Sequence, residues 1–152
     1  MPVAVLPPAS YASLEPLLAA YAQEMRGHLA GCMVADAGAA AALLDAPMVT
    51  VLLAQEAGQA CGFAILFELP EVVFARRCGQ LDDLFVLPRH RGRGIARALV
   101  AAAVQHGRTR QWSHLRWMVP AGDTGAIALY DRIASATDWR SYVIRLEAAA
   151  SL

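Results

Sequence analysis

The organisation of this chain is set by one continuous stretch, Leu81-Asp82-Asp83-Leu84-Phe85-Val86-Leu87-Pro88-Arg89-His90-Arg91-Gly92-Arg93-Gly94-Ile95-Ala96-Arg97. Its apolar first part predicts a strand that stops at Pro88, and the apolar positions after Gly94 recur at helical spacing. The loop between them leads directly into the helix, so the first N–H groups and the positive dipole end of the helix face that loop. Two glycines let an anion approach the backbone, and four nearby arginines add positive charge. The stretch therefore predicts an anion-binding loop.

Several anions are compatible with such a loop, and the sequence separates some of them. A nucleoside triphosphate loop of the Walker type needs a lysine, and all 13 basic residues here are arginines. A dinucleotide fingerprint would place glycine at position 97 and a carboxylate about 20 residues later, and neither is present. A zero net charge and the lack of aromatic residues among the arginines argue against nucleic acid. A surface loop with glycines for turn geometry alone remains an alternative.

The rest of the chain predicts a mixed α/β fold in one domain, residues 1–152. Strands are predicted at residues 3–6, 48–55, 60–69, 80–87, 115–119 and 141–146, with a hairpin turn at 56–59 and a strand or loop at 71–77. One helix begins at a Ser10 or Ser13 cap and ends near Gly27, and an alanine-rich helix capped by Asp36 ends before Pro47. The helix after Gly94 is predicted to end at Gly107. Asp123 or Thr124 is predicted to cap a last short helix that carries Ile127, Leu129, Tyr130 and Ile133.

Composition excludes several classes of protein. Apolar residues make up 57% of the 152 residues, but their longest run covers residues 37–44, too short for a bilayer, and no signal peptide is recognisable. Three dispersed cysteines and four histidines without ligand spacing predict a cytoplasmic protein without a metal. Charge is uneven: residues 1–88 hold three arginines against nine acids, and residues 89–152 hold ten against four. Separate anion-binding and cation-binding parts are one explanation; chance is the other.

Three segments resemble the GNAT superfamily of N-acetyltransferases. Arg91-x-x-Gly94-x-Ala96 matches the motif that cradles the pyrophosphate of coenzyme A, and Ala126-x-x-x-Tyr130 follows at the family's spacing. Gly62-Phe63-Ala64, the strand from Leu81 to Val86 and Trp139-Arg140 are similar to segments of the diamine and polyamine acetyltransferase branch. The resemblance implies a mostly antiparallel N-terminal sheet, a splayed pair of parallel strands that holds coenzyme A, and a homodimer.

The resemblance also implies which residues bind acetyl-coenzyme A. The backbone of Leu84, Phe85 and Val86 would bond the pantetheine arm as an added strand does. Asp123 stands where the branch usually has asparagine, beside the cofactor, and Ile133-Ala134-Ser135 replaces a usual Leu-Gly-Phe turn. The pyrophosphate would lie against Arg91, Gly92, Arg93, Gly94, Ile95, Ala96 and Arg97.

Catalytic and acceptor residues follow by the same resemblance. Tyr130 would protonate the departing thiolate, since a phenol is protonated at neutral pH; a packing role is the alternative. Asp82 would orient the acceptor amine or receive its proton, whereas alternation along the strand is expected to turn Asp83 to the opposite face. Tyr21, Glu24, Asp82 and Trp139 would contact the acceptor.

The predicted function is acetyl transfer from acetyl-coenzyme A to a primary amine of a small cationic molecule. No cysteine falls within the motifs, so direct attack in a ternary complex is expected rather than a covalent acyl-enzyme. Neither a metal, nor nucleic acid, nor a membrane partner is expected. Two alternatives stay open: a coenzyme A-binding regulatory domain without turnover, and an acetyltransferase of protein or peptide amines.

Overall fold

The structure is a computed structural model that describes residues 2–26 and 36–144. The chain forms two compact units, residues 1–120 and 121–152. The described range ends at 144, so the last two positions of the strand predicted at 141–146 lie outside it. No helix among the described residues is both long enough and apolar enough to cross a membrane.

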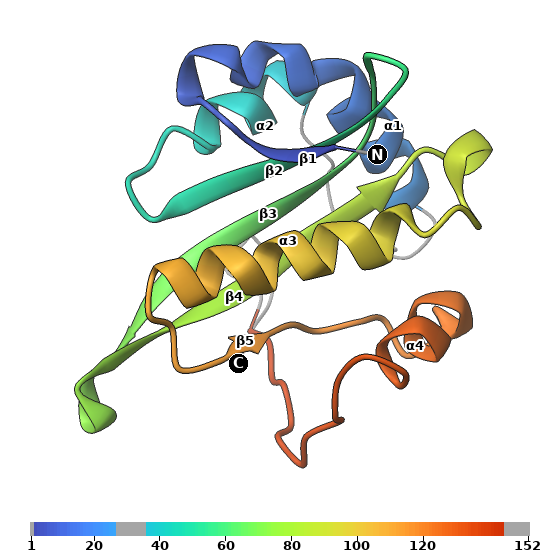
Figure 1. The fold of residues 1–152 in the computed structure, drawn as a ribbon. Helices are drawn as coiled ribbons and strands as arrows, with labels where there is room; N and C mark the ends of the chain where they lie inside the picture. Colours follow the sequence, from blue (N-terminus) through green and yellow to red (C-terminus); the bar gives the residue numbers. More distant parts are fainter. Residues whose placement is uncertain (1, 27–35, 145–152) are drawn as a thin grey trace. The chain divides into compact units, whose positions relative to one another are not determined.

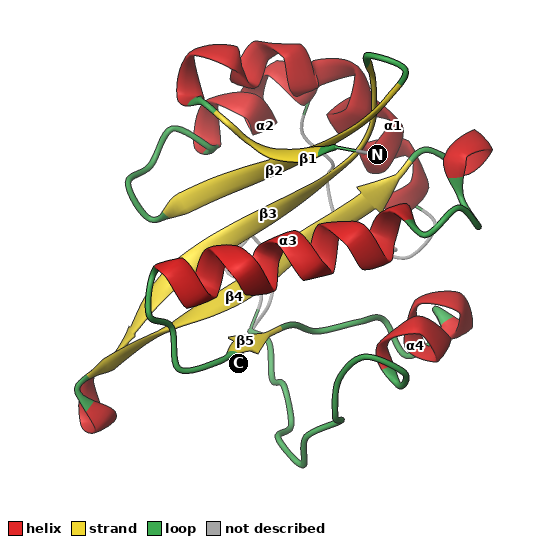
Figure 2. Cartoon of the chain, in the orientation of Figure 1, coloured by secondary structure: helices red, strands yellow, loops and turns green. Residues whose placement is uncertain are grey.

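The first unit is built on a five-stranded mixed sheet in the order β1-β2-β3-β4-β5 (Figures 1 and 2). The strands are β1 (Val3–Leu6), β2 (Val49–Glu56), β3 (Gln59–Glu71), β4 (Arg76–Val86) and β5 (Leu115–Arg116). The pairs from β1 to β4 are antiparallel, and β4 and β5 are parallel. This is the predicted α/β arrangement of an antiparallel part followed by a parallel pair.

Two tight connections produce the antiparallel part. Ala57 and Gly58 join β2 to β3 with positive φ angles of 50° and 78°, as in the two-residue turns that match strand twist. Residues 71–77, for which the sequence allows a strand or a loop, contain a short 3-10 helix, Val72–Phe74, and then Ala75 at φ 49°. As a result β4 begins at Arg76, four residues earlier than predicted.

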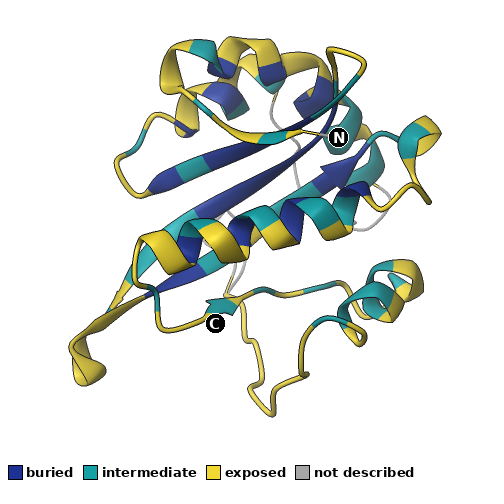
Figure 3. Cartoon of the chain, viewed as in Figure 1, coloured by how far each residue is buried: buried dark blue, intermediate teal, exposed yellow. Residues whose placement is uncertain are grey.

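Helices cover both faces of the sheet (Figure 1). α1 (Glu15–Met25) and α2 (Ala37–Leu43) pack on one face, where the core cluster includes Leu14, Leu17, Leu18, Val51, Phe63, Ile65 and Phe85. α3 (Ile95–Thr109) lies along the other face and buries Ile95, Leu99, Val100 and Ala103. The central strands are therefore buried along most of their length, whereas the tip of the β3–β4 hairpin is exposed (Figure 3).

The helix starts agree only partly with the prediction. Neither Ser10 nor Ser13 caps α1, because both lie in a 3-10 helix, Pro8–Leu14, where the Ser13 hydroxyl donates to the Ser10 carbonyl at 2.7 Å. The cap of α2 is confirmed: the Asp36 carboxylate accepts from the Ala39 N–H at 2.9 Å.

The predicted end of α3 at Gly107 is wrong, since the helix continues to Thr109. Gly107 is instead buried under the indole of Trp112: a Cβ there would lie 2.7 Å from the ring. A Cβ at Gly79 on β4 would lie 2.2 Å from the same ring. Both glycines thus make room for one tryptophan between the helix and the sheet.

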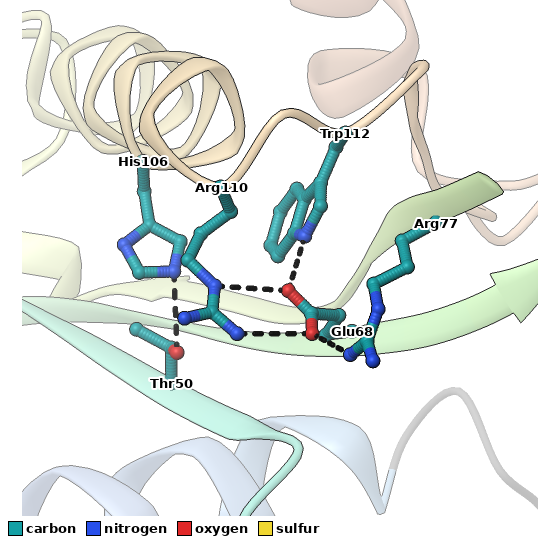
Figure 4. A network of polar contacts seen from close by, with 6 residues as sticks. All are labelled: Thr50, Glu68, Arg77, His106, Arg110 and Trp112. Atoms are coloured by element: carbon teal, nitrogen blue, oxygen red, sulfur yellow. Dashed lines mark hydrogen bonds and ion pairs between the residues drawn. The ribbon is translucent and has the colours of Figure 1, made fainter.

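A polar network closes this end of the first unit (Figure 4). The Glu68 carboxylate on β3 accepts two hydrogen bonds from Arg110, both 3.0 Å, and one from Trp112 Nε1 at 2.7 Å, and it also pairs with Arg77. These partners, Arg110 first, lower the pKa of Glu68 to about 2. The carboxylate therefore ties β3 to β4 and to the end of α3.

The two strands predicted last differ from the structure. β5 spans only 115–116, because β4 carries an irregularity just beyond their paired residues and the ladder stops there. Residues 141–144 form no strand. In the described part of the second unit the regular element is the helix α4 (Thr124–Tyr130). Residues 141–144 therefore have no strand in that part of the unit with which to form a sheet. Its predicted cap is confirmed: Asp123 accepts from the Ala126 N–H at 2.9 Å.

Candidate functional site

The predicted anion-binding loop lies at the C-terminal end of β4, where the chain passes into α3. Gly92 and Gly94 have φ angles of 74° and 79°, and a Cβ at either position would have no atom within 4 Å. Gly94 is the N-cap of α3 and provides no side-chain cap, and the first turn of the helix has no acidic residue. The backbone at the helix start is thus open to a ligand and carries the positive end of the dipole, so it fits a pyrophosphate.

Two carboxylates fasten this loop to the rest of the unit. The Glu56 carboxylate at the end of β2 contacts His90 Nδ1 at 2.7 Å and accepts from Arg93 at 3.0 Å. The hydrogen bond from His90 is the main cause that lowers the pKa of Glu56. Glu24 on α1 pairs with Arg91, whose Nε also donates to the Val86 carbonyl at 2.9 Å. The sequence did not suggest Glu56 or His90, which lie 34 residues apart.

Two of the loop arginines are therefore already paired with carboxylates. Arg91 and Arg93 each balance one acid, while Arg97 is exposed in the first turn of α3 and Arg89 donates to His90 Nε2 at 3.2 Å. Glu24, expected to meet an acceptor amine, here neutralises Arg91. The loop keeps a positive excess with its geometry fixed by ion pairs.

The C-terminal half of β4 pairs with β3 on one side and lies beyond its two residues of pairing with β5 on the other. Leu87 donates to the Cys61 carbonyl, which fixes the residues of β4 that bond to β3. In an antiparallel ladder these alternate with residues whose N–H and C=O groups point away. By this register the backbone groups of Leu84 and Val86 face away from β3, and the Val86 carbonyl is the one that accepts from Arg91 Nε. Phe85 instead turns its side chain into the core.

A β-bulge interrupts β4 at Asp82. The register pairs Ile65 with Asp83 but Leu66 with Leu81, which leaves Asp82 without a partner on β3. An extra residue shifts the alternation of side chains by one position. Strict alternation does not hold across a bulge, so the expectation that Asp82 and Asp83 lie on opposite faces does not apply here. Asp82 is exposed and accepts from the Gln80 amide at 2.9 Å.

Asp83 and Tyr21 form a partly buried polar contact beside the bulge. The Tyr21 hydroxyl donates to Asp83 Oδ1 at 2.7 Å, and its ring packs between Phe63 and Phe85, at centroid distances of 5.7 and 5.4 Å. Burial is the largest cause that raises the pKa of both groups; nearby Asp82 raises both further. Asp83, which the sequence offers as the alternative to Asp82, is thus the carboxylate of the two that Tyr21 contacts.

The remaining predicted residues belong to the second unit. Tyr130 ends α4, and burial followed by the Asp123 carboxylate raises the pKa of its phenol. Asp123 serves as the helix cap. Trp139 is 90% exposed and lies in a segment without regular structure.

Comparison with known proteins bears on this geometry. A model of the acetyltransferase (GNAT) family matches residues 14–134. The chain belongs to the GNAT family of acetyltransferases. Its five-stranded sheet with a parallel pair is the predicted GNAT-type fold. This GNAT match includes residues of both units.

Solved structures show what this GNAT chain is similar to. One is a ribosomal-protein-alanine N-acetyltransferase from Brucella melitensis biovar Abortus 2308, 37% identical, with 96% of this chain and 100% of that chain covered and a TM-score of 0.81. Another is an aminoglycoside acetyltransferase from an uncultured soil metagenomic sample, 26% identical over 96% and 98%, with a TM-score of 0.79. No curated protein matches the chain. The comparisons confirm the superfamily but do not confirm the polyamine branch.

Proposed function

We propose that this chain is an acetyl-coenzyme A-dependent N-acetyltransferase that acts on a primary amine of a small cationic acceptor. The observation that carries the proposal is the hydrogen bond from Tyr21 on α1 to Asp83 on β4, the strand that leads from the bulge into the glycine loop. The edge of β4 suits the pantetheine arm of coenzyme A, and the glycine loop suits its pyrophosphate. The acidic pair Asp82 and Asp83 suits a cation.

The residues of the first unit account for capture and deprotonation of the amine. An alkylammonium is attracted by the two carboxylates but has no lone pair until it loses a proton. Tyr21 donates to Oδ1 of Asp83, so Oδ2 can accept from the ammonium, and the raised pKa of Asp83 makes this carboxylate a better base than an ordinary aspartate. The neutral amine then attacks the thioester carbonyl carbon directly, the carbon–sulfur bond breaks, and the new amide nitrogen releases a second proton to water.

A proton must also reach the thiolate that leaves. We assign this step to Tyr130, on the motif Ala126-x-x-x-Tyr130. Burial and Asp123 raise the pKa of its phenol, so the hydroxyl is protonated at neutral pH and can donate. Trp139 and Glu24 remain proposed acceptor contacts, and Glu24 would act through its ion pair with Arg91.

A protein amine is the second candidate acceptor. It is favoured by the 37% identity to a ribosomal-protein-alanine N-acetyltransferase. An N-terminal amine presents the same ammonium to Asp83, so the two candidates differ in what surrounds the nitrogen. The homodimer and the cytoplasmic location implied by the resemblance are kept as parts of the proposal, and sedimentation would test the first.

Thiol release from acetyl-coenzyme A over a panel of acceptors tests the proposal. The panel contains a linear polyamine, an aminoglycoside, a peptide with N-terminal alanine and the same peptide with its N-terminus blocked. We expect turnover with cationic amines and its loss in Asp83→Asn. Turnover with the free alanine peptide alone selects the second candidate. Calorimetric binding of coenzyme A without turnover on any amine contradicts an enzyme and favours a regulatory domain.

A further inference from the structure

A cluster of three unlike side chains lies at the opposite end of β4 from the glycine loop. Glu71 ends β3, Cys78 is in β4, and His114 directly precedes β5. One ligand atom from each residue lies within 4.8 Å of the others. Along β4, Cys78 is five residues from Asp83, about 16 Å, and eight residues from Val86, about 26 Å. The cluster is therefore separate from the proposed acetyl-transfer site.

We propose that Glu71, Cys78 and His114 form a Zn²⁺ site. Carboxylate oxygen, thiolate sulfur and imidazole nitrogen are together the ligand types that suit zinc, and three protein ligands leave a fourth position for water. Two atoms bound to zinc at about 2.1 Å in tetrahedral geometry are about 3.4 Å apart. His114 Nε2 and Glu71 Oε1 are already 3.7 Å apart. Only small side-chain movements are needed to bring the ligands to bonding distance.

Neighbouring groups orient two of these ligands. Ser113 Oγ lies 3.0 Å from His114 Nδ1, and it lies 3.2 Å from Glu71 Oε2. When Nδ1–H donates to Ser113, the tautomer leaves the lone pair on Nε2, the atom that faces Glu71. Arg76 donates to Oε2 of Glu71 at 2.6 Å, so Oε1 is the oxygen that the metal would take. The site thus has the outer hydrogen bonds that metal-bound histidines and carboxylates use.

The exposure of two of the three ligands allows a zinc ion to enter the cluster from solvent. The side chains of His114 and Glu71 are 38% and 16% exposed, whereas Cys78 is fully buried behind them. Binding replaces the S–H bond of Cys78 with a Zn–S bond and releases one proton to water. The bound ion would join β3, β4 and the start of β5, a strand of only two residues. Zinc should therefore stabilise the parallel pair.

Cobalt titration of the full chain without a histidine tag tests the site. The background carries Cys32→Ser and Cys61→Ser, so that Cys78 is the remaining thiol. We expect a thiolate-to-cobalt charge-transfer band that saturates at one equivalent, is displaced by Zn²⁺ and is abolished by Cys78→Ser. His114→Gln and Glu71→Gln should each lower affinity at least tenfold, as loss of a ligand does. His106→Gln, a histidine outside the cluster, should bind as the background does.

Thermal unfolding supplies a second readout. Zn²⁺ should raise the Tm of the background and of His106→Gln but not that of His114→Gln, whose exposed side chain can be exchanged without disturbing the core. A folded background protein that gives no charge-transfer band overturns the site. Equal affinity in His114→Gln also overturns it, because the metal would then be held elsewhere. Acetyl transfer plays no part in either measurement, so failure of the proposed function leaves this test unaffected.

Discussion

At the scale of single residues, the hydrogen bond between Tyr21 and Asp83 determines how readily the proposed base takes a proton. Burial and the charge of Asp82 raise the pKa of Asp83, whereas the Tyr21 hydrogen bond lowers it. Asp82 and Tyr21 therefore shift the pKa of the Asp83 carboxyl in opposite directions. Removing each of them separately should move the pH dependence of the reaction in opposite directions.

We expect Tyr21→Phe to shift the acid limb of kcat/KM to higher pH. The hydroxyl that stabilises the Asp83 carboxylate is lost, so the pKa rises and the base becomes protonated earlier as pH falls. Asp82→Asn should shift the same limb to lower pH, because a repulsive charge is removed. Initial rates from pH 4 to about 9 would measure both shifts. Identical profiles in wild type and both variants would exclude Asp83 as the base.

We expect Tyr130→Phe to lower kcat by roughly 10²–10⁴-fold, the usual contribution of a positioned acid, with coenzyme A affinity retained. Tyr142→Phe is the matched control, since that phenol is in the same unit and 85% exposed. Steady-state kinetics and calorimetry separate the two effects. A Tyr130→Phe enzyme with the kcat of the control would mean that this ring only packs.

At the scale of elements, the loop that joins β4 to α3 depends on two glycines with positive φ. Gly94→Val should abolish coenzyme A binding, because a branched side chain would occupy the open space over the helix start. Gly58→Val is the control, since Gly58 has almost the same φ, 78° against 79°, and equally open surroundings. Both variants lose stability by at least about 1 kcal/mol from the left-handed backbone. Calorimetry should show lost binding in the first variant alone; equal affinities would contradict the loop assignment.

The sequence predicts which segments form helices and strands more reliably than it predicts which face of the sheet each strand residue occupies. The hairpin at 57–58, the Asp36 and Asp123 caps and the change from strand to helix around Gly94 follow from local residue types, and all are present. The bulge at Asp82 was not predictable, because no residue there requires one. It arises from pairing with Ile65 and Leu66 on another strand. The expected alternation of Asp82 and Asp83 does not take this irregularity into account.

At the scale of the whole molecule, contacts between distant positions hold the first unit together, and sequence reasoning found few of them. Glu68 meets Arg110 across 42 residues, and Glu24 meets Arg91 across 67. Local spacing cannot indicate such pairs, since any exposed acid could join any exposed arginine. The excess of acids before residue 89 and of arginines after it does agree with these pairings.

The Glu68 network predicts a specific loss of stability in acid. Its pKa is lowered from 4.5 to about 2, so it stabilises the fold fully above pH 4.5 and loses that contribution as pH falls toward 2. Glu68→Gln should be less stable than wild type at neutral pH and should lose less stability over that interval. Glu15→Gln, which changes an exposed acid at the start of α1, is the control. Urea unfolding at several pH values would measure this; parallel curves for all three proteins would contradict it.

The extra residue in β4, Asp82, affects how the sequence of this protein can evolve. Deleting Asp82 would bring Leu81 and Asp83 into one continuous ladder with β3 and would let the parallel pairing with the next strand extend. The shortened protein should be the more stable one. It would also close the strand edge at Leu84 and Val86 to a ligand. Selection for robustness alone would favour the deletion, so an intact insertion in descendants of this gene would report that the site is still in use.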